Sequence, residues 1–130
     1  MNVFVPVDGS DCSARAVAFA AEMAERYGGD LSVVHLSDAD TDAARAALDA
    51  AREGLPAEYD GDASFEVVVR EMASPTASRI GQEILAHARE ADADHVVMGH
   101  HGAGVVERAI LGSAAETVVR GEMMPVTVVP

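Results

Sequence analysis

Five short apolar segments alternate with longer alanine-rich segments along this chain, and that alternation is the strongest constraint on its fold. The apolar segments are rich in β-branched residues, as strands are, and they cover residues 3–7, 31–36, 65–70, 95–98 and 126–129. Between them, small and apolar residues recur every three or four positions, the spacing of an amphipathic helix. The alternation predicts an α/β fold, a doubly wound parallel sheet with helices on both faces.

Residues with strong positional preferences mark the ends of the predicted helices. Gly28 and Gly54 follow the first and second helical segments, as glycine commonly does at a helix C-terminus. Ser74 and Pro75 predict the N-cap and the first turn of the third helix, because proline suits the first helical position. At 130 residues the chain has the size of one domain, so we expect residues 1–130 to form a single domain.

The chain is strongly acidic and contains no lysine. Its 22 acidic residues and 9 arginines give a net charge of −13. Nucleic-acid binding is not expected, because a phosphate backbone requires clustered lysine or arginine. The missing lysine also excludes a phosphate-binding P-loop of the Gly-Lys-Ser/Thr kind and Schiff-base chemistry. Acidic, lysine-free surfaces resemble those of proteins from salt-loving microbes, in which salt screens the self-repulsion, although tuning for solubility alone is the other interpretation.

Two features predict the compartment. No apolar run approaches the ~20 residues that a membrane span needs, so no membrane association is expected. The chain has one cysteine, Cys12, which we interpret as a small core residue and which fits a reducing compartment. A cytoplasmic location is therefore expected.

The most informative motif for function is a spaced set of glycines after the fourth predicted strand. It has the form Gly-x2-Gly-x9-Gly-Ser and comprises Gly99, Gly102, Gly112 and Ser113. Backbone N–H groups at such a position, after a strand and at the start of a helix, suit phosphate groups. The last predicted helix begins at Ser113, which also has the spacing of a capping box with Glu116, an interpretation that needs no ligand.

Asp8 ends the first apolar segment and begins the turn-forming run Asp-Gly-Ser-Asp. Its carboxylate could accept a hydrogen bond from a ribose hydroxyl or an adenine amino group, or it could cap the first helix through an Asx turn. Ligands of doubly wound sheets bind outside the carboxyl ends of the strands, where the strand order reverses. Asp8 and the glycine motif are expected to face each other there, which favours the binding hypothesis.

The other polar candidates have alternative structural interpretations. His100 and His101 lie inside the glycine motif and could contact phosphate or a divalent metal, but two neighbouring histidines make a weak metal site, and solvent-facing positions are the alternative. Arg108 could contact a phosphate or pair with an acidic residue. His35 and His95 lie within apolar segments, and we interpret them as sheet residues rather than ligands.

Taken together, these motifs resemble the universal stress protein family. The resemblance rests on Val-Pro-Val-Asp-Gly-Ser at residues 5–10, on the glycine spacing with Val-Val-Met before it, and on the C-terminal Pro-Val-x-Val-Val. It covers the whole chain, and the spacing is similar to that of the ATP-binding branch. It implies an adenine nucleotide alpha hydrolase-like fold with five strands in the order 3-2-1-4-5. It also implies ATP with Mg²⁺ or Mn²⁺ as ligand, and a homodimer through Val126–Val129.

The same resemblance implies which residues surround the nucleotide. They are Pro6, Val7, Asp8, Leu36, Met98, Gly99, Gly102, Gly112, Ser113 and Ala114. The three residues at the end of the first strand would surround the adenine and ribose, and Leu36 would pack on the adenine. The two that end the fourth strand would line the ribose, and the last four would hold the phosphates.

The function implied by the resemblance is that of a nucleotide-binding stress-response protein with little or no catalytic turnover. Two alternatives remain, a slow ATPase of the same fold and a dimeric scaffold that binds no nucleotide. Binding is favoured over catalysis because Asp8 is the one evident base for activating water, and the ribose would occupy it. The Asp-Gly-Ser-Asp-Cys-Ser run also differs from the Ser-Gly-Gly-x-Asp-Ser of pyrophosphatase-type relatives.

Overall fold

A computed structural model describes residues 1–71, 76–100 and 111–130 of the chain. Strands and helices alternate, as the sequence predicts. The elements are β1 (Asn2–Pro6), α1 (Asp11–Tyr27), β2 (Asp30–Ser37), α2 (Asp42–Glu53), β3 (Ala63–Val69), α3 (Ala77–Glu90), β4 (His95–Gly99), α4 (Ser113–Arg120) and β5 (Val126–Val129). In the described ranges, no helix has the length and apolar character needed to cross a membrane.

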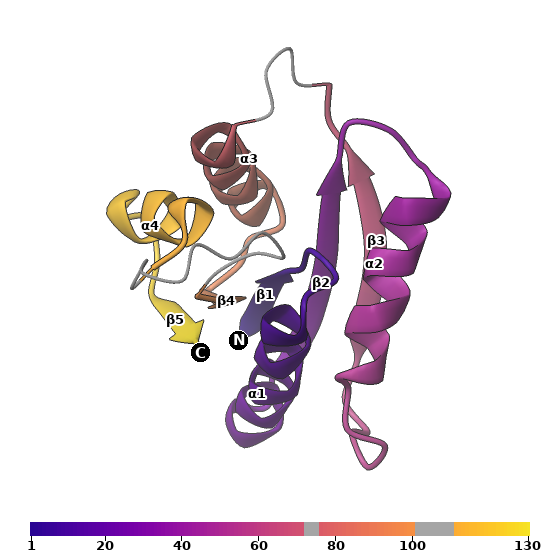
Figure 1. The fold of residues 1–130 in the computed structure, drawn as a ribbon. Helices are drawn as coiled ribbons and strands as arrows, with labels where there is room; N and C mark the ends of the chain where they lie inside the picture. The colour runs from indigo at the N-terminus through magenta and orange to yellow at the C-terminus, as the bar shows by residue number, and fades with distance from the viewer. Residues whose placement is uncertain (72–75, 101–110) are drawn as a thin grey trace.

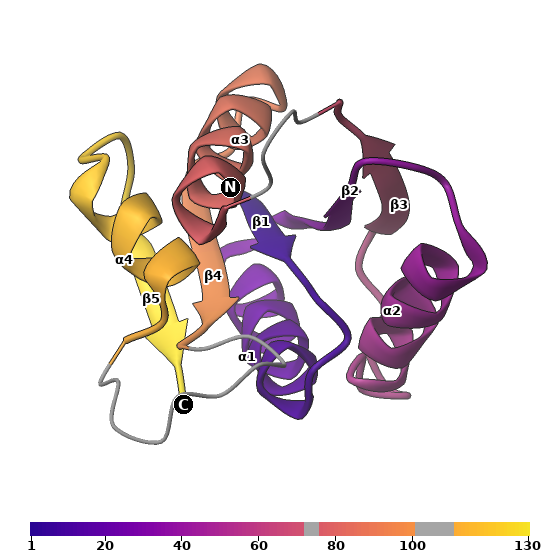
Figure 2. The same cartoon turned by 45° about the horizontal axis from the view of Figure 1, so that its top comes forward.

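The strands form one five-stranded sheet in the order β3-β2-β1-β4-β5, which confirms the predicted topology. All four strand pairs are parallel. Helices α1 and α2 cover one face, and α3 and α4 cover the other (Figures 1 and 2). Both β3 and β5 are therefore edge strands, and β1 lies at the centre.

The sheet separates two apolar cores. Val3 and Val5 of β1, and Val7 directly after it, pack with α1 and α2, whereas Phe4 packs on the opposite face with α3 and α4. This division follows from the pleat, which directs successive side chains to opposite faces. Because β1 is covered on both sides, its residues form a continuous apolar run rather than an alternating one.

Glycines end three of the described helices, and two of these glycines are the predicted ones. Gly28 follows α1 in the left-handed conformation, with φ of 64°, and its N–H group bonds the last carbonyls of the helix. Gly54 follows α2, and Gly121 follows α4. The positions of Gly28 and Gly54 in the sequence thus predicted the ends of α1 and α2, whereas the C-cap of α3 is Ala91.

The predicted start of α3 is wrong by two residues. Thr76, rather than Ser74, is the N-cap, and its hydroxyl oxygen accepts a hydrogen bond from the Arg79 N–H group at 3.1 Å. Ala77 therefore takes the first helical position that we predicted for Pro75. Ser74 and Pro75 themselves lie outside the described residues. A threonine directly after the proline supplies an equally good cap, and the sequence pattern does not rank the two hydroxyls.

The helix α4 begins at Ser113 as predicted, but the capping box is absent. Gly112 is the N-cap, and no side chain caps the helix. Ser113 is already helical, and Glu116 pairs with Arg120 at 2.9 Å instead of folding back toward the N-cap. Hydroxyl groups of Ser10, Thr41 and Thr76 cap the other three helices. The start of α4 thus differs from them in having a glycine N-cap, and within residues 1–71, 76–100 and 111–130 no side chain caps its first turn.

His95 connects β4 to the edge strand β5, since its Nε2 atom lies 2.8 Å from the Thr127 hydroxyl oxygen. Burial lowers the pKa of His95 below the ordinary histidine value. The folded state therefore disfavours the imidazolium form, and stability is lost as the pH falls below the ordinary histidine pKa toward the lowered one. We expect His95→Gln to lose less stability than the wild type between neutral pH and about pH 5, measured by urea unfolding. Identical pH profiles for the two proteins would contradict this assignment.

Candidate functional site

The candidate site lies at the carboxyl ends of β1 and β4, where the strand order reverses. Helix α1, which follows β1 in the chain, covers one face of the sheet, and α4, the helix that follows β4, covers the other (Figure 2). Connections that diverge to opposite faces leave the strand ends between them accessible, which is where doubly wound proteins bind ligands.

Three of the predicted site residues form an apolar surface across the central strands. Leu36 of β2 and Met98 of β4 both belong to the core on the side of α3 and α4. Pro6 is buried, and alternation along β1 places it on that same face, two residues beyond Phe4. The register pairs Pro6 with Val34 of β2. These three side chains lie on adjacent strands and form one apolar surface on this face of the sheet, with Pro6 and Met98 buried and Leu36 half-buried.

Val7, in contrast, does not join this surface through its side chain. It is 6% exposed and belongs to the opposite core, with α1 and α2. Its backbone N–H group donates to the Val34 carbonyl at 2.9 Å, and its carbonyl accepts from Nδ1 of His35 at 2.7 Å. Both interactions fix the end of β1, and His35 is a sheet residue, as interpreted from the sequence. The period of two along β1 contained this signal, because Pro6 and Val7 are neighbours and must face opposite sides.

Asp8 is exposed and forms the turn that leads into α1. Its Oδ1 atom accepts a hydrogen bond from the Ser10 N–H group at 3.0 Å, which is an Asx turn. Gly9 has a φ of 85°, and a Cβ atom there would lie 3.1 Å from the Cα atom of Ala47 in α2. The structure therefore shows the local role that we weighed for Asp8. A carboxylate can accept several hydrogen bonds, so this turn is compatible with a contact to a ribose hydroxyl.

The described parts of the glycine motif meet at the end of β4. The N–H group of Gly112 donates to the His100 carbonyl, which holds the start of α4 against the residue that follows β4. A helix N-terminus carries about +0.5 of a charge together with unsatisfied N–H groups. Ser113 is exposed and Ala114 is half-buried, so these N–H groups lie near the surface. Gly102, His101 and Arg108 lie outside the described residues.

Gly99, the first glycine of the motif, is required by the packing of the fold. A Cβ atom on Gly99 would lie 2.7 Å from Sγ of Cys12 in the first turn of α1. Cys12 is 1% exposed, which confirms that it is a core residue. Close packing of α1 on β4 therefore explains glycine at this position without any ligand.

His100, for which we weighed a solvent-facing position against a phosphate or metal contact, packs partly against α1. Its side chain is half-buried, and Nδ1 lies 3.3 Å from Sγ of Cys12. These two residues are 88 positions apart in the chain, so no local pattern could indicate the contact. The physical reason is the path of the chain after β4, which places the first residue beyond the strand over the start of α1.

Two arginines of the described structure, Arg45 and Arg120, are engaged in ion pairs. Arg120 of α4 is bonded to Glu116 at 2.9 Å, and Arg45 of α2 is bonded to Asp40 at 2.7 Å. The hydrogen bond from Arg45 lowers the pKa of the Asp40 carboxyl, so this pair stays charged well into the acidic range. In residues 1–71, 76–100 and 111–130, no three His, Cys, Asp or Glu side chains gather to hold a metal ion.

The sheet order and the uncapped helix at its switch point define a doubly wound α/β protein with its candidate site at the strand carboxyl ends. The family profile of the universal stress proteins matches residues 1–130, so the chain belongs to the universal stress protein family. The family that the sequence motifs resemble is thereby confirmed.

Individual relatives agree with this assignment. Universal stress protein MJ0531 from Methanocaldococcus jannaschii is 28% identical over 147 residues, which cover 98% of this chain and 81% of the relative. A universal stress protein solved in complex with cAMP is 26% identical with a TM-score of 0.77, covering 98% of this chain and 94% of that one. The universal stress protein from Archaeoglobus fulgidus in complex with dAMP is 25% identical with a TM-score of 0.72, covering 100% and 98% of the two chains.

Proposed function

We propose that this protein binds an adenine nucleotide, ATP together with Mg²⁺ or Mn²⁺, at the carboxyl ends of β1 and β4. In this proposal residues 1–130 act as one domain, which works as a cytoplasmic stress-response homodimer with little or no catalytic turnover. The observation that carries it is the start of α4 at Gly112, which has no side-chain cap and is held against the end of β4. Two related structures contain cAMP and dAMP, which are both adenine nucleotides.

The proposed contacts follow the geometry of the site. The adenine would lie on the surface formed by Pro6, Leu36 and Met98, and Asp8 would accept a hydrogen bond from a ribose hydroxyl. Val7 and Gly99 would contribute backbone atoms beside them. The phosphates would be held by the segment that contains Gly102, Gly112, Ser113 and Ala114, mostly through backbone N–H groups.

Binding rather than hydrolysis is proposed because of the position of Asp8. One of its carboxylate oxygens already accepts the Ser10 N–H group, and the ribose would engage the carboxylate further. A general base must reach the attacking water in a suitable geometry, which a carboxylate occupied in this way does not. The slow ATPase is therefore the second candidate.

The charge of the chain sets the conditions for binding. A net charge of −13 repels a polyphosphate, and the divalent cation would arrive with the ligand. We propose that the protein works at high salt, because molar salt shortens the Debye length to about 3 Å and screens this repulsion.

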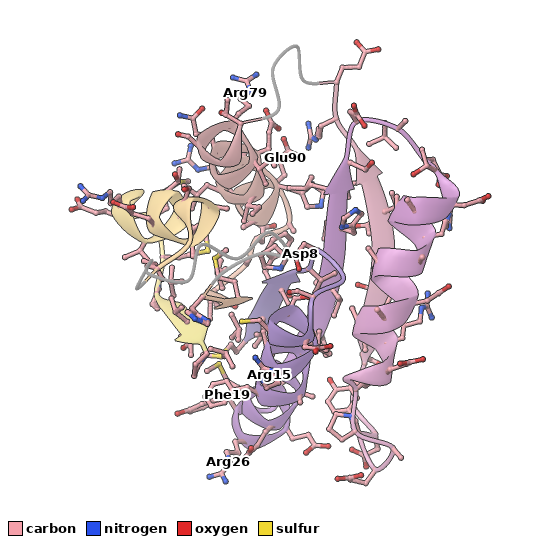
Figure 3. All side chains as sticks on the ribbon, in the orientation of Figure 1. Asp8, Arg15, Phe19, Arg26, Arg79 and Glu90 are labelled. Carbon is pink, nitrogen blue, oxygen red and sulfur yellow. The ribbon has the colours of Figure 1, made fainter. Side chains whose placement is uncertain are left out.

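The proposed homodimer uses the edge strand β5. All four residues of β5 are half-buried, and β5 ends the sheet, so its outer backbone groups are available to a second copy. Phe19 of α1 and Val119 of α4 are each 43% exposed. Phe19 extends from α1 on the side of β5 in Figure 3. Apolar side chains on the two helices that contact β5 would extend the paired strands into a wider interface.

Titration calorimetry with ATP and Mg²⁺ at molar KCl tests the binding proposal. We expect the wild type to bind and both Asp8→Ala and Asp8→Asn to weaken binding by about tenfold, because each removes a charged acceptor from the ribose. Asp8→Asn is the matched control, since its amide oxygen can still accept the Ser10 N–H group and keep the turn.

The pattern of results separates the candidate functions. A loss of affinity in Asp8→Ala alone would assign Asp8 to the turn and remove it from the ligand contacts. No heat from ATP, AMP or cAMP with either metal at any salt concentration would leave the dimeric scaffold as the function. Rapid phosphate release that depends on Asp8 would favour the ATPase.

A further inference from the structure

The carbonyl of Val129, at the end of β5, accepts hydrogen bonds from two distant parts of the chain. The backbone N–H group of His100 donates to it at 2.9 Å, and Sγ of Cys12 donates to it at 3.1 Å. His100 follows β4, and Cys12 lies in the first turn of α1. One carbonyl at the edge of the sheet thus joins β5 to the residue that begins the connection toward α4.

The side chains of Cys12 and His100 complete this cluster. Sγ of Cys12 lies 3.3 Å from Nδ1 of His100. A thiol has one hydrogen, and when that hydrogen is directed to Val129 the imidazole donates its own hydrogen from Nδ1 to the sulfur. Cys12 is 1% exposed, so water competes little for these contacts. Arg15, on the same helix, donates from Nε to the carbonyl of Pro130 at 2.9 Å and holds the next residue as well (Figure 3).

The cluster continues to the proposed phosphate site. The carbonyl of His100 accepts the N–H group of Gly112, the N-cap of α4. His100 therefore contacts β5 through its N–H group, α4 through its carbonyl and α1 through its ring. The end of β5 and the N-terminus of α4 are thus hydrogen-bonded to the same residue, His100.

We infer that pairing of β5 with a second copy and nucleotide binding at α4 stabilise each other through Cys12 and His100, an inference that rests on the proposed function. A half-buried edge strand of four residues is prone to fray at its end. Fraying of Val129 breaks its bonds to His100 and Cys12 together, and a ligand that needs the ordered arrangement must restore both. A second copy paired along β5 holds Val129 in place, so each binding event lowers the ordering cost of the other.

The dissociation constant of the dimer, measured by sedimentation equilibrium with and without saturating ATP and Mg²⁺, tests this coupling. We expect ATP to tighten the wild-type dimer by about tenfold. In Cys12→Ala, ATP should change the dimer dissociation constant by no more than about twofold. Cys12→Ser keeps a hydrogen-bond donor and should restore part of the effect of ATP. Val17→Ala is the matched control, because Val17 is buried on α1 outside this cluster. Its truncation should lower the stability without changing the effect of ATP on the dimer dissociation constant.

Calorimetry on the same samples keeps the two proposals apart. ATP that binds without changing the dimer dissociation constant overturns the coupling and leaves the proposed function intact. The coupling is also overturned if Cys12→Ala and Val17→Ala reduce the effect of ATP on the dimer dissociation constant equally, because general destabilisation would then be the cause. Absence of ATP binding overturns the proposed function, and the coupling falls with it, as it does if the chain stays monomeric under all conditions.

Discussion

Gly112→Asp is expected to stabilise the fold slightly and to abolish nucleotide binding. At the N-cap of α4 the new carboxylate would accept a backbone N–H group of the first turn, as Ser10 does from Ser13 in α1. Gly112 has φ of −66° and ψ of 155°, an extended conformation that aspartate adopts without strain. Aspartate is a better N-cap than glycine and also complements the helix dipole, which together add about 0.5 kcal/mol to the free energy of unfolding.

The same carboxylate would compete directly with the ligand. It would occupy the N–H groups proposed for the phosphates, and its charge would repel them, an effect worth several kcal/mol in a close contact. We therefore expect the affinity for ATP, measured by calorimetry, to fall by about 100-fold or more. Urea unfolding on the same protein gives the change in stability.

The opposite signs of these two effects make the experiment specific. A substitution that only damages the fold lowers both the stability and the affinity for ATP, whereas Gly112→Asp should raise the stability and lower the affinity. Gly112→Ala is the control without a carboxylate, which should keep most of the affinity while losing about 1 kcal/mol of helix capping. Wild-type affinity in Gly112→Asp would show that the phosphates do not lie at the start of α4.

Phe4→Ala is expected to have the largest effect on stability. Phe4 is 0% exposed, lies in the central strand, and contacts the His87 ring with a centroid distance of 5.7 Å. Removing a fully buried phenylalanine costs about 3–5 kcal/mol, through lost burial and the cavity that remains. The free energy of unfolding, from urea titration at constant salt, measures this loss.

Phe19 provides the matched control for this substitution. It is the same residue type but 43% exposed, on the outer side of α1. At a protein concentration at which the proposed dimer has dissociated, Phe19→Ala should cost less than about 1 kcal/mol, because its side chain is then exposed and tolerates truncation. Equal losses in the two variants would contradict the assignment of Phe4 to the core between the sheet and α3.

Much of the fold could be predicted because it depends on local periodicity. The β-branched runs and the alanine-rich helices locate all the strands and helices, and Gly28 and Gly54 end two helices where the sequence indicates. The strand order came from the resemblance of the motifs to a family, since periodicity alone does not rank the possible orders of parallel strands. Edge positions followed once that order was known.

The errors arose where neighbouring residues compete or where contacts are remote. Thr76 took the cap predicted for Ser74, and Gly112 took the cap predicted for Ser113, because adjacent residues can fill the same role within one or two positions. The contact of His100 with Cys12 joins segments 88 positions apart and depends on the fold as a whole. The candidate nucleotide contacts remain predictions.

The glycine N-cap of α4 makes the order of this helix depend on the nucleotide in the proposed complex. In the described residues, hydroxyl groups cap the first turns of α1, α2 and α3, whereas the N-cap of α4 is a glycine, which has no side chain to accept those N–H groups. In the proposed complex the phosphate would accept hydrogen bonds from the N–H groups in the first turn of α4. A fall in nucleotide concentration would then leave the first turn of α4 less ordered, beside the edge strand β5 of the proposed dimer.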